Sequence, residues 1–271
     1  MTTQLQKTFY TLALMVFSLC SLAQTDAREI MDLVDSREDG VSSSATMTMV
    51  LIDSKGKKRT RTMKTFSKEV DEYITHSATF FLTPSDVKNT AFLTYDYSGE
   101  NKDDDQWMYL PALKKTKRIP SSDKDASFMG SDFSYSDMTD KELDDYDYTV
   151  IKETSIKRKD AKVPVWVVES VPRTQKTIDE TGYKKSTLYI RKDNYVLVRA
   201  KFYLQKANRV KYLDVRKLEK INGIWVPTLT TMTTKQGKKT LHKTILKQID
   251  MKMNIDISND IFTIRAIEKG L

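Results

Sequence analysis

The sequence has few of the residues that metal sites, redox sites and nucleotide-binding loops need. Its 271 residues include one cysteine, Cys20, two histidines, His76 and His242, and eight glycines. This leaves little material for a zinc site, a cysteine nucleophile or a set of disulfides. No two glycines are close enough for a G-x-G-x-x-G motif or a P-loop, which excludes the common nucleotide-binding motifs. We therefore expect neither a metal nor a cofactor.

Long hydrophobic runs are also lacking, apart from one near the amino terminus. Residues 8–23 carry no charge and follow Lys7, but the run is shorter than the about 20 apolar residues that span a bilayer. A basic residue, an apolar core and a small residue at Ala23 are typical of a cleavable signal peptide. We expect residues 1–23 to be a cleavable signal peptide for export, and residues 24–271 to form a single domain. The alternative is one anchor helix.

The charge balance is basic, with 45 Lys+Arg against 37 Asp+Glu and a net charge of +8. Hydrophobic residues make up 39% of the chain, which is typical of a globular protein. In an intracellular protein this charge would suggest nucleic acid. In an exported protein it favours anionic lipid, acidic partners or simply a solvated surface, so we expect no nucleic-acid partner.

Apolar and polar residues alternate over most of the chain, which predicts strands. In residues 44–52 the methionines alternate with threonines, and in residues 241–253 Ile245 and Met251 fall on one face while His242 falls on the other. Short polar turns such as Asn222-Gly223 separate the strands. We expect a mainly β fold of about ten or eleven antiparallel strands in meander order, which must close or curl to bury one face.

Helices are expected at only a few places. Residues 26–36 place apolar side chains at helical spacing, and residues 136–143 are a second candidate. A short turn is expected near residues 258–262. These elements would cover an opening in the sheet.

The alternation stops between Asp103 and Asp140, where aromatic residues, a basic cluster and a Gly-Ser-Asp sequence lie together. A segment of this length is usually functional or disordered, and its aromatic content argues against disorder. Three chemical interpretations are open. Residues 103–105 are three aspartates, but they lack the spacing of a calcium loop. Ser131 lacks the G-x-S-x-G context of a nucleophile, and Asp132 with Asp137 resembles paired acid and base groups but also suits a helix cap.

The same segment carries a family resemblance. Residues 107–112 read WMYLPA, residues 117–119 read KRI, and residues 128–138 read FMGSDFSYSDM. This pattern resembles the bacterial outer-membrane lipoprotein-sorting proteins of the LolA-like superfamily. The resemblance extends over nearly the whole chain after the signal peptide, with Asn89 where the family more often has glycine.

The resemblance implies a strongly curved, incomplete antiparallel barrel with helices over its open side. It also implies a non-enzymatic carrier of lipid or lipid-modified cargo in the periplasm, beside an inner-membrane permease of the RND or MMPL type and an outer-membrane acceptor. A periplasmic accessory subunit that docks on a transporter without holding lipid is one alternative. An enzyme acting on envelope lipids or glycans is another, and a cluster of Ser131 or Asp132 with His242 in a pocket would favour it.

An apolar trough in such a fold would hold acyl chains, and methionine side chains adapt to variable cargo. We expect five side chains to line the trough: Met47, Met49, Met232, Ile245 and Met251. The dense segment supplies the candidates for contact with cargo or a partner, either as a lid or as a structural plug. These candidates are Trp107, Tyr109, Pro111, Arg118, Phe128, Met129, Asp132, Phe133 and Tyr135.

Overall fold

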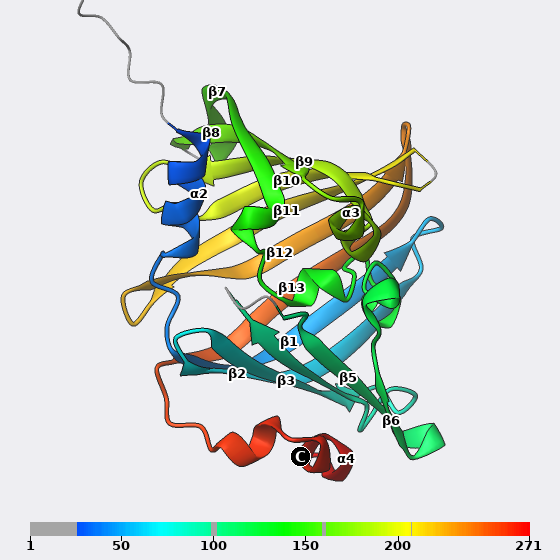
Figure 1. Ribbon diagram of the computed structural model, residues 1–271. Helices are drawn as coiled ribbons and strands as arrows, with labels where there is room; N and C mark the ends of the chain where they lie inside the picture. The colour runs from blue at the N-terminus through cyan, green and yellow to red at the C-terminus, as the bar shows by residue number, and fades with distance from the viewer. Residues whose placement is uncertain (1–25, 99–101, 159–160, 207) are drawn as a thin grey trace, which may run out of the picture.

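The computed structural model describes residues 26–98, 102–158, 161–206 and 208–271. The predicted signal peptide therefore lies outside the described residues. Within them, thirteen antiparallel strands form a single curved sheet (Figure 1). The strands are β1 (Ser42–Asp53), β2 (Lys58–Asp71), β3 (Ile74–Thr83), β4 (Ala91–Tyr97), β5 (Asp105–Leu110), β6 (Lys115–Arg118), β7 (Tyr146–Arg158), β8 (Ala161–Pro172), β9 (Tyr183–Arg191), β10 (Leu197–Leu204), β11 (Arg209–Ile221), β12 (Ile224–Gln236) and β13 (Lys239–Met253).

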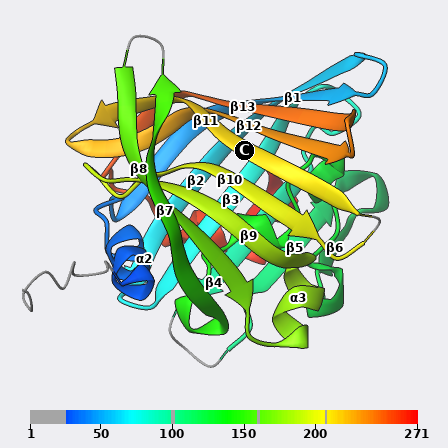
Figure 2. The ribbon, with the colours of Figure 1, turned by 90° about the horizontal axis from the view of Figure 1, so that it is seen from above.

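The sheet consists of two meanders joined side by side. Strands β1–β6 form the amino-terminal half and β7–β13 the carboxy-terminal half, and β1 pairs with β13 at the centre, with Met49 opposite Leu246. Strands β6 and β7 are the two edges, so the sheet is not closed into a barrel (Figure 2). The predicted incomplete antiparallel barrel in meander order is confirmed. The expected number of strands was too low, because short edge strands such as β6 show little alternation.

Three α-helices are present in the described residues: α2 (Ala27–Asp35), α3 (Gln175–Thr181) and α4 (Ile264–Lys269). Helix α2 matches the first predicted helix. Its Asp26 cap accepts the backbone N–H of Arg28, and its Ile30 and Met31 are buried against the carboxy-terminal half. A 3₁₀ turn at Asn259–Phe262 confirms the turn expected near the carboxy terminus. Helix α3 was not predicted.

The helix predicted over residues 136–143 is wrong. The chain there forms only short 3₁₀ turns, at Ser136–Met138 and at Leu143–Asp145. The backbone N–H of Asp140 is donated to the Asp96 carboxylate at 2.6 Å. A helical hydrogen bond to a carbonyl four residues earlier is therefore not made at this position.

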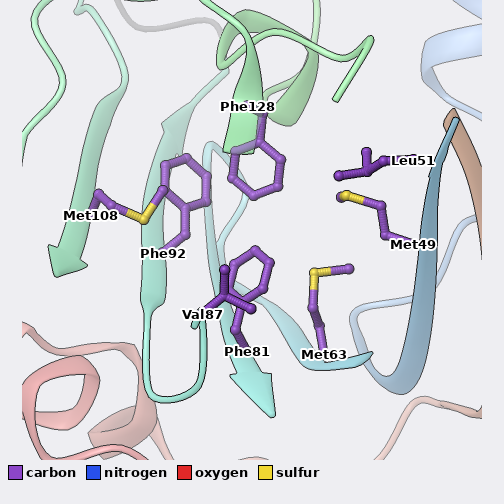
Figure 3. Packing of buried hydrophobic residues seen from close by; sticks show 8 residues of the cluster. All are labelled: Met49, Leu51, Met63, Phe81, Val87, Phe92, Met108 and Phe128. Atoms are coloured by element: carbon purple, nitrogen blue, oxygen red, sulfur yellow. The ribbon is translucent and has the colours of Figure 1, made fainter. Parts of the chain in front are cut away.

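The segment that joins the two edges crosses the open, concave side of the sheet. We call residues 119–145 the crossing segment, because they lead from β6 to β7 (Figure 1). An antiparallel bridge between Ser127 and Ser134 folds its middle part into a compact turn. Phe128 from this turn is buried in the main core of the amino-terminal half (Figure 3). The crossing segment thus packs into the concave face instead of passing over it.

The amino-terminal half is covered on both faces. The core around Phe128 lies on the concave side. A second cluster packs Phe80 and Leu93 against Phe262 and Ile267 near α4. The helices in the described part of the chain are all too short or too polar to cross a bilayer.

Candidate binding trough

A cavity rich in methionine lies on the concave face where β1, β2, β12 and β13 meet. We call it the methionine cavity; its volume is about 320 Å³. Met47 and Met49 come from alternate positions of β1, Met63 comes from β2, and Met138 comes from the crossing segment. The other lining residues are Thr65, Thr79, Phe128, Phe133, Asp137, Pro227, Thr230, Leu246 and Gln248. The walls are thus mainly apolar and flexible, which suits a variable apolar ligand.

A larger cavity of about 480 Å³ lies beside it, under α2 and the crossing segment. We call it the acidic cavity, because its apolar side chains are accompanied by many carboxylates. The apolar lining includes Met31, Val34, Phe133, Leu143, Leu188, Leu197, Phe202, Leu213 and Met232, and the carboxylates are Asp35, Asp39, Asp104, Asp137, Asp140, Glu142, Asp145 and Glu180. Arg37, Lys124 and Lys141 supply the cations.

Phe133 and Asp137 line both cavities, so the crossing segment separates them. Phe133 is buried, and the Asp137 carboxylate accepts a hydrogen bond from the backbone N–H of Ser134 at 2.8 Å. The hydroxyl of Tyr183 donates to Asp137 at 2.9 Å, and Lys211 lies behind this pair. Together the two cavities form a trough that the crossing segment divides.

Asp132 attaches one part of the crossing segment to the sheet. Its buried carboxylate accepts hydrogen bonds from the hydroxyls of Thr234 at 2.5 Å and Thr244 at 2.7 Å, and lies 2.7 Å from Nδ1 of His242. All three partners project from the concave faces of β12 and β13. The backbone N–H of Asp132 also donates to the Thr244 hydroxyl at 2.9 Å. A fully bonded, buried carboxylate of this kind holds the turn in place.

A second attachment lies near the other end of the crossing segment. Asp140 is bound through its N–H to Asp96 at the end of β4, and Lys141 donates to the Ser170 hydroxyl of β8 at 2.6 Å. Burial raises the pKa of Asp96 to about 7. The Asp140 carboxyl reaches solvent. Partial desolvation by the surrounding protein, and next the nearby Asp39 carboxylate, raise its pKa to about 6. Burial lowers the pKa of Lys141 to about 7.

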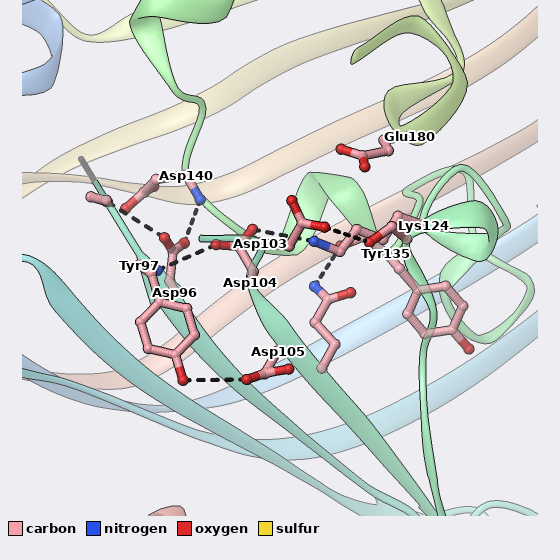
Figure 4. Close-up of polar contacts among 12 residues, drawn as sticks. Asp96, Tyr97, Asp103, Asp104, Asp105, Lys124, Tyr135, Asp140 and Glu180 are labelled. Carbon is pink, nitrogen blue, oxygen red and sulfur yellow. Dashed lines mark hydrogen bonds and ion pairs between the residues drawn. The ribbon is translucent and has the colours of Figure 1, made fainter. Parts of the chain in front are cut away.

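The three consecutive aspartates at the start of β5 do not form a calcium site. Asp103 accepts from Lys176 at 2.9 Å, and Asp105 pairs with Arg118. Asp104 lies 3.7 Å from the buried ammonium of Lys124 (Figure 4). Each carboxylate therefore faces a different cation, and the described residues contain no group of acidic, histidine or cysteine side chains that could hold a metal ion.

A third cavity of about 390 Å³ lies at one end of the concave face, and we call it the hairpin cavity. Lys206, Arg209, Lys211, Leu241 and His242 are among its lining residues. The Asp132–His242 pair at this cavity resembles the pair that orients histidine in hydrolases. The hydroxyl of Ser131, however, accepts the N–H of Phe133 at 3.1 Å, and no hydroxyl in the described part of the chain is hydrogen-bonded to His242. Ser131, Asp132 and His242 thus line the same cavity, but the hydrogen bonds of the described residues link His242 to Asp132 and not to Ser131.

The structure brings together only some of the predicted site residues. Phe128, Met129 and Tyr135 pack with the core beside the methionine cavity, and Phe133 lines it. Trp107 and Tyr109 lie on the opposite face of β5 and pack with the cluster near α4. The inward residue between them is Met108, which is buried with Phe128.

Pro111 and Arg118 lie outside the trough. Pro111 begins a 3₁₀ turn, Pro111–Leu113, between β5 and β6. The side chain of Arg118 is 60% exposed and is paired with Asp105. Arg118 therefore lies at the surface and lines none of the three cavities found in the described residues.

Three of the five predicted trough residues line the trough: Met47, Met49 and Met232. The two predicted residues of β13 lie elsewhere. Its concave face carries His242, Thr244, Leu246 and Gln248, while Ile249 on the other face is 39% exposed. Ile245 and Met251 line none of the three cavities found in the described residues. Two features explain this placement. His242 and Thr244 on the concave face bond Asp132. In addition, a bulge at Asp250, whose φ is +52°, changes the alternation.

The sequence analysis missed several residues that line the trough or attach the crossing segment. Met63 follows the alternation of β2, so the pattern applied to that strand could have found it. Asp96 and Lys141 offer no such signal, because their role depends on contacts between distant parts of the chain.

Comparison with known proteins supports the same fold. A family model described as "uncharacterized protein" matches residues 74–269. A solved domain from Vibrio parahaemolyticus, described as an outer membrane lipoprotein-sorting protein domain, is 30% identical with a TM-score of 0.79, covering 89% of this chain and 98% of the other. The chain belongs to the outer-membrane lipoprotein-sorting protein family. No curated protein matches it.

Two further solved structures are similar to this chain. A DUF1329 family protein from Desulfovibrio piger is 30% identical, with a TM-score of 0.78, over 89% of this chain and 97% of the other. A LolA superfamily protein from Nitrosomonas europaea is 19% identical with a TM-score of 0.64 over 88% and 97% of the two chains, which shows a shared fold.

Proposed function

We propose that the protein is a periplasmic carrier that binds the acyl part of a lipid or lipid-modified cargo in its divided trough. The observation that supports this most directly is the methionine cavity, an apolar space of about 320 Å³ on the concave face. Each buried CH₂ group contributes about 0.8 kcal/mol, so even a partly buried acyl chain gains substantial affinity before ordering costs. The name of the Vibrio relative points to the same class of cargo.

The proposal extends to the partners that the family resemblance implies. The donor would be an inner-membrane permease of the RND or MMPL type, and the acceptor would lie at the outer membrane. In this scheme the protein has no catalytic role and needs no cofactor.

One observation favours a second candidate, an accessory subunit that docks on a transporter and holds no lipid. Phe128 of the crossing segment packs into the core of the amino-terminal half, and hydrogen bonds attach the segment at several places, Asp132 and Asp140 among them. A permanent plug of this kind would leave the cavities too small for cargo.

Native mass spectrometry of protein purified from periplasm without detergent, followed by lipid extraction, separates the two candidates. Thr230 lines the methionine cavity, whereas Thr233 on the same strand lines none of the three cavities of the described residues. We expect a stoichiometric lipid adduct in the wild type and in Thr233→Trp, and its loss in Thr230→Trp. A wild-type protein without adduct, or a Thr230→Trp variant that loads normally, would contradict the carrier proposal.

A further inference from the structure

Three hairpin turns lie side by side at one end of the sheet. Strand pairing places Ile52 opposite Lys58, Asp53 opposite His242, and Gln236 opposite both Lys239 and Arg209. The turns between β1 and β2, between β12 and β13, and between β10 and β11 therefore project from the same end (Figure 1). We call this the basic hairpin end. Its cations are Lys55, Lys57, Lys58, Arg59, Lys206, Arg209, Lys235, Lys238 and Lys239.

Most of this positive charge is not neutralised. All nine cations except the half-buried Lys235 are exposed. Asp125 lies 2.8 Å from Lys206, and Asp53 accepts the backbone N–H groups of Lys55 and Lys57. In the described residues, no ion pair involves the side chains of the lysines in the β1–β2 and β12–β13 turns. The end as a whole therefore presents a strong positive field.

A fourth turn at the same end adds an apolar side chain. Strand pairing of Ala91 with Tyr109, and of Leu110 with Lys115, places the β5–β6 turn at this end. Leu113 in this turn is 54% exposed and is followed by the exposed Lys114. An exposed leucine beside lysines is the combination that enters the interface of an anionic bilayer.

The opposite end of the amino-terminal half carries acidic residues. The turn between β2 and β3 contains Asp71 and Glu72, and Glu38 and Asp39 lie in the segment before β1. The charges are thus separated within the amino-terminal half, whereas the opposite end of the carboxy-terminal half carries exposed lysines such as Lys157, Lys162 and Lys220.

We propose that the basic hairpin end docks on a bilayer surface that contains anionic lipid. The hairpin cavity lies directly behind it, because Lys206, Arg209, Thr234 and Leu241 line that cavity. Docking would therefore place the hairpin cavity, at this end of the concave face, next to the membrane. The charges are spread over separate turns and not around a shaped groove, which favours a lipid surface over an acidic protein. This inference concerns the surface that the protein meets, and it holds whether or not the trough carries cargo.

Co-sedimentation with phosphatidylcholine vesicles, with and without phosphatidylglycerol, tests the proposal. The triple variant Lys57→Glu, Lys238→Glu, Lys239→Glu reverses exposed charges at the basic hairpin end. Its matched control, Lys157→Glu, Lys162→Glu, Lys220→Glu, makes the same change in net charge at the opposite end of the sheet. All six lysines are exposed, so both variants should fold, as urea denaturation would verify.

We expect the wild type to bind only the anionic vesicles, and to bind them more weakly at high salt, because the screening length shrinks from about 8 Å at physiological ionic strength. The hairpin variant should lose about tenfold or more in partitioning, and the control much less. Equal binding to both vesicle types, or equal losses in both variants, would overturn the proposal. Mass spectrometry of the same samples measures bound cargo separately from vesicle binding. A variant that still loads lipid but no longer binds the vesicles has lost docking alone.

Discussion

Two of the places at which the crossing segment is attached to the sheet differ in kind. At Asp132, a buried carboxylate accepts three hydrogen bonds from one wall, formed by β12 and β13. At Asp140 and Lys141, single hydrogen bonds reach two different walls, through Asp96 of β4 and Ser170 of β8. The second attachment also contains groups whose pKa values lie near 6 to 7. The comparison suggests a segment that is held firmly at Asp132 and is more easily released at Asp140.

The largest effect is expected from Asp132→Ala. The substitution leaves the hydroxyls of Thr234 and Thr244 and the ring of His242 without their shared acceptor. We expect a loss of about 3 kcal/mol in the free energy of unfolding, measured by urea denaturation. Asp132→Asn, which keeps one carbonyl oxygen, should lose less than the alanine variant. A change below about 1 kcal/mol in Asp132→Ala would contradict the view of Asp132 as the firm attachment.

The sequence predicts the sheet well because alternation is a local property. The inward methionines of β1, Met47 and Met49, follow directly from it. On β13 the alternation points to the other face, because the inward His242 and Thr244 are polar and bond Asp132, and because the bulge at Asp250 changes the alternation. The alternation of apolar and polar residues predicts which side chains face the core only where their partners in the core are apolar.

The second attachment could not be predicted, for a different reason. Asp96 and Asp140 are 44 positions apart, and their contact depends on how far the crossing segment travels across the open face. The neighbours of Asp96 do not mark it as buried, and those of Asp140 do not mark its backbone N–H as the donor to Asp96. The family motif located the segment, but only the fold shows which residues of it turn inward.

A smaller effect is expected from Asp96→Asn. The pKa of Asp96 is about 7 in the folded protein against an ordinary value of 3.8, so the folded state binds this proton more tightly. Its contribution to stability therefore falls as the pH rises from about 4 to 7. Asparagine removes this dependence and still accepts the N–H of Asp140. We expect the variant to be about 2 kcal/mol more stable than the wild type at pH 8, with little difference at pH 4.

Urea denaturation at a series of pH values measures this difference. Asp71→Asn, at an exposed position in the turn before β3, is a matched control that should show no comparable change. A variant that is less stable than the wild type at pH 8 would mean that the charged Asp96 strengthens the attachment more than its burial weakens the fold.

The smallest effect is expected from Lys141→Met, on the other side of the same attachment. Burial lowers the pKa of Lys141 to about 7 from 10.5, so the unfolded chain binds this proton more tightly. The stability contributed by the neutral amine is therefore lost as the pH falls from 10.5 to 7. Methionine removes that cost but also the hydrogen bond to Ser170 and the contact with the Tyr146 ring, 3.6 Å from the ammonium.

We expect a net gain of about 1 kcal/mol for Lys141→Met below pH 7, which disappears towards pH 10. Lys152→Met, at an exposed position of β7, should leave stability nearly unchanged at both pH values. If Lys141→Met instead lowers stability at pH 6 by as much as Asp132→Ala does, the charged amine holds the segment as firmly as Asp132. The two attachments would then be equivalent, and the crossing segment would be a plug fixed at both places.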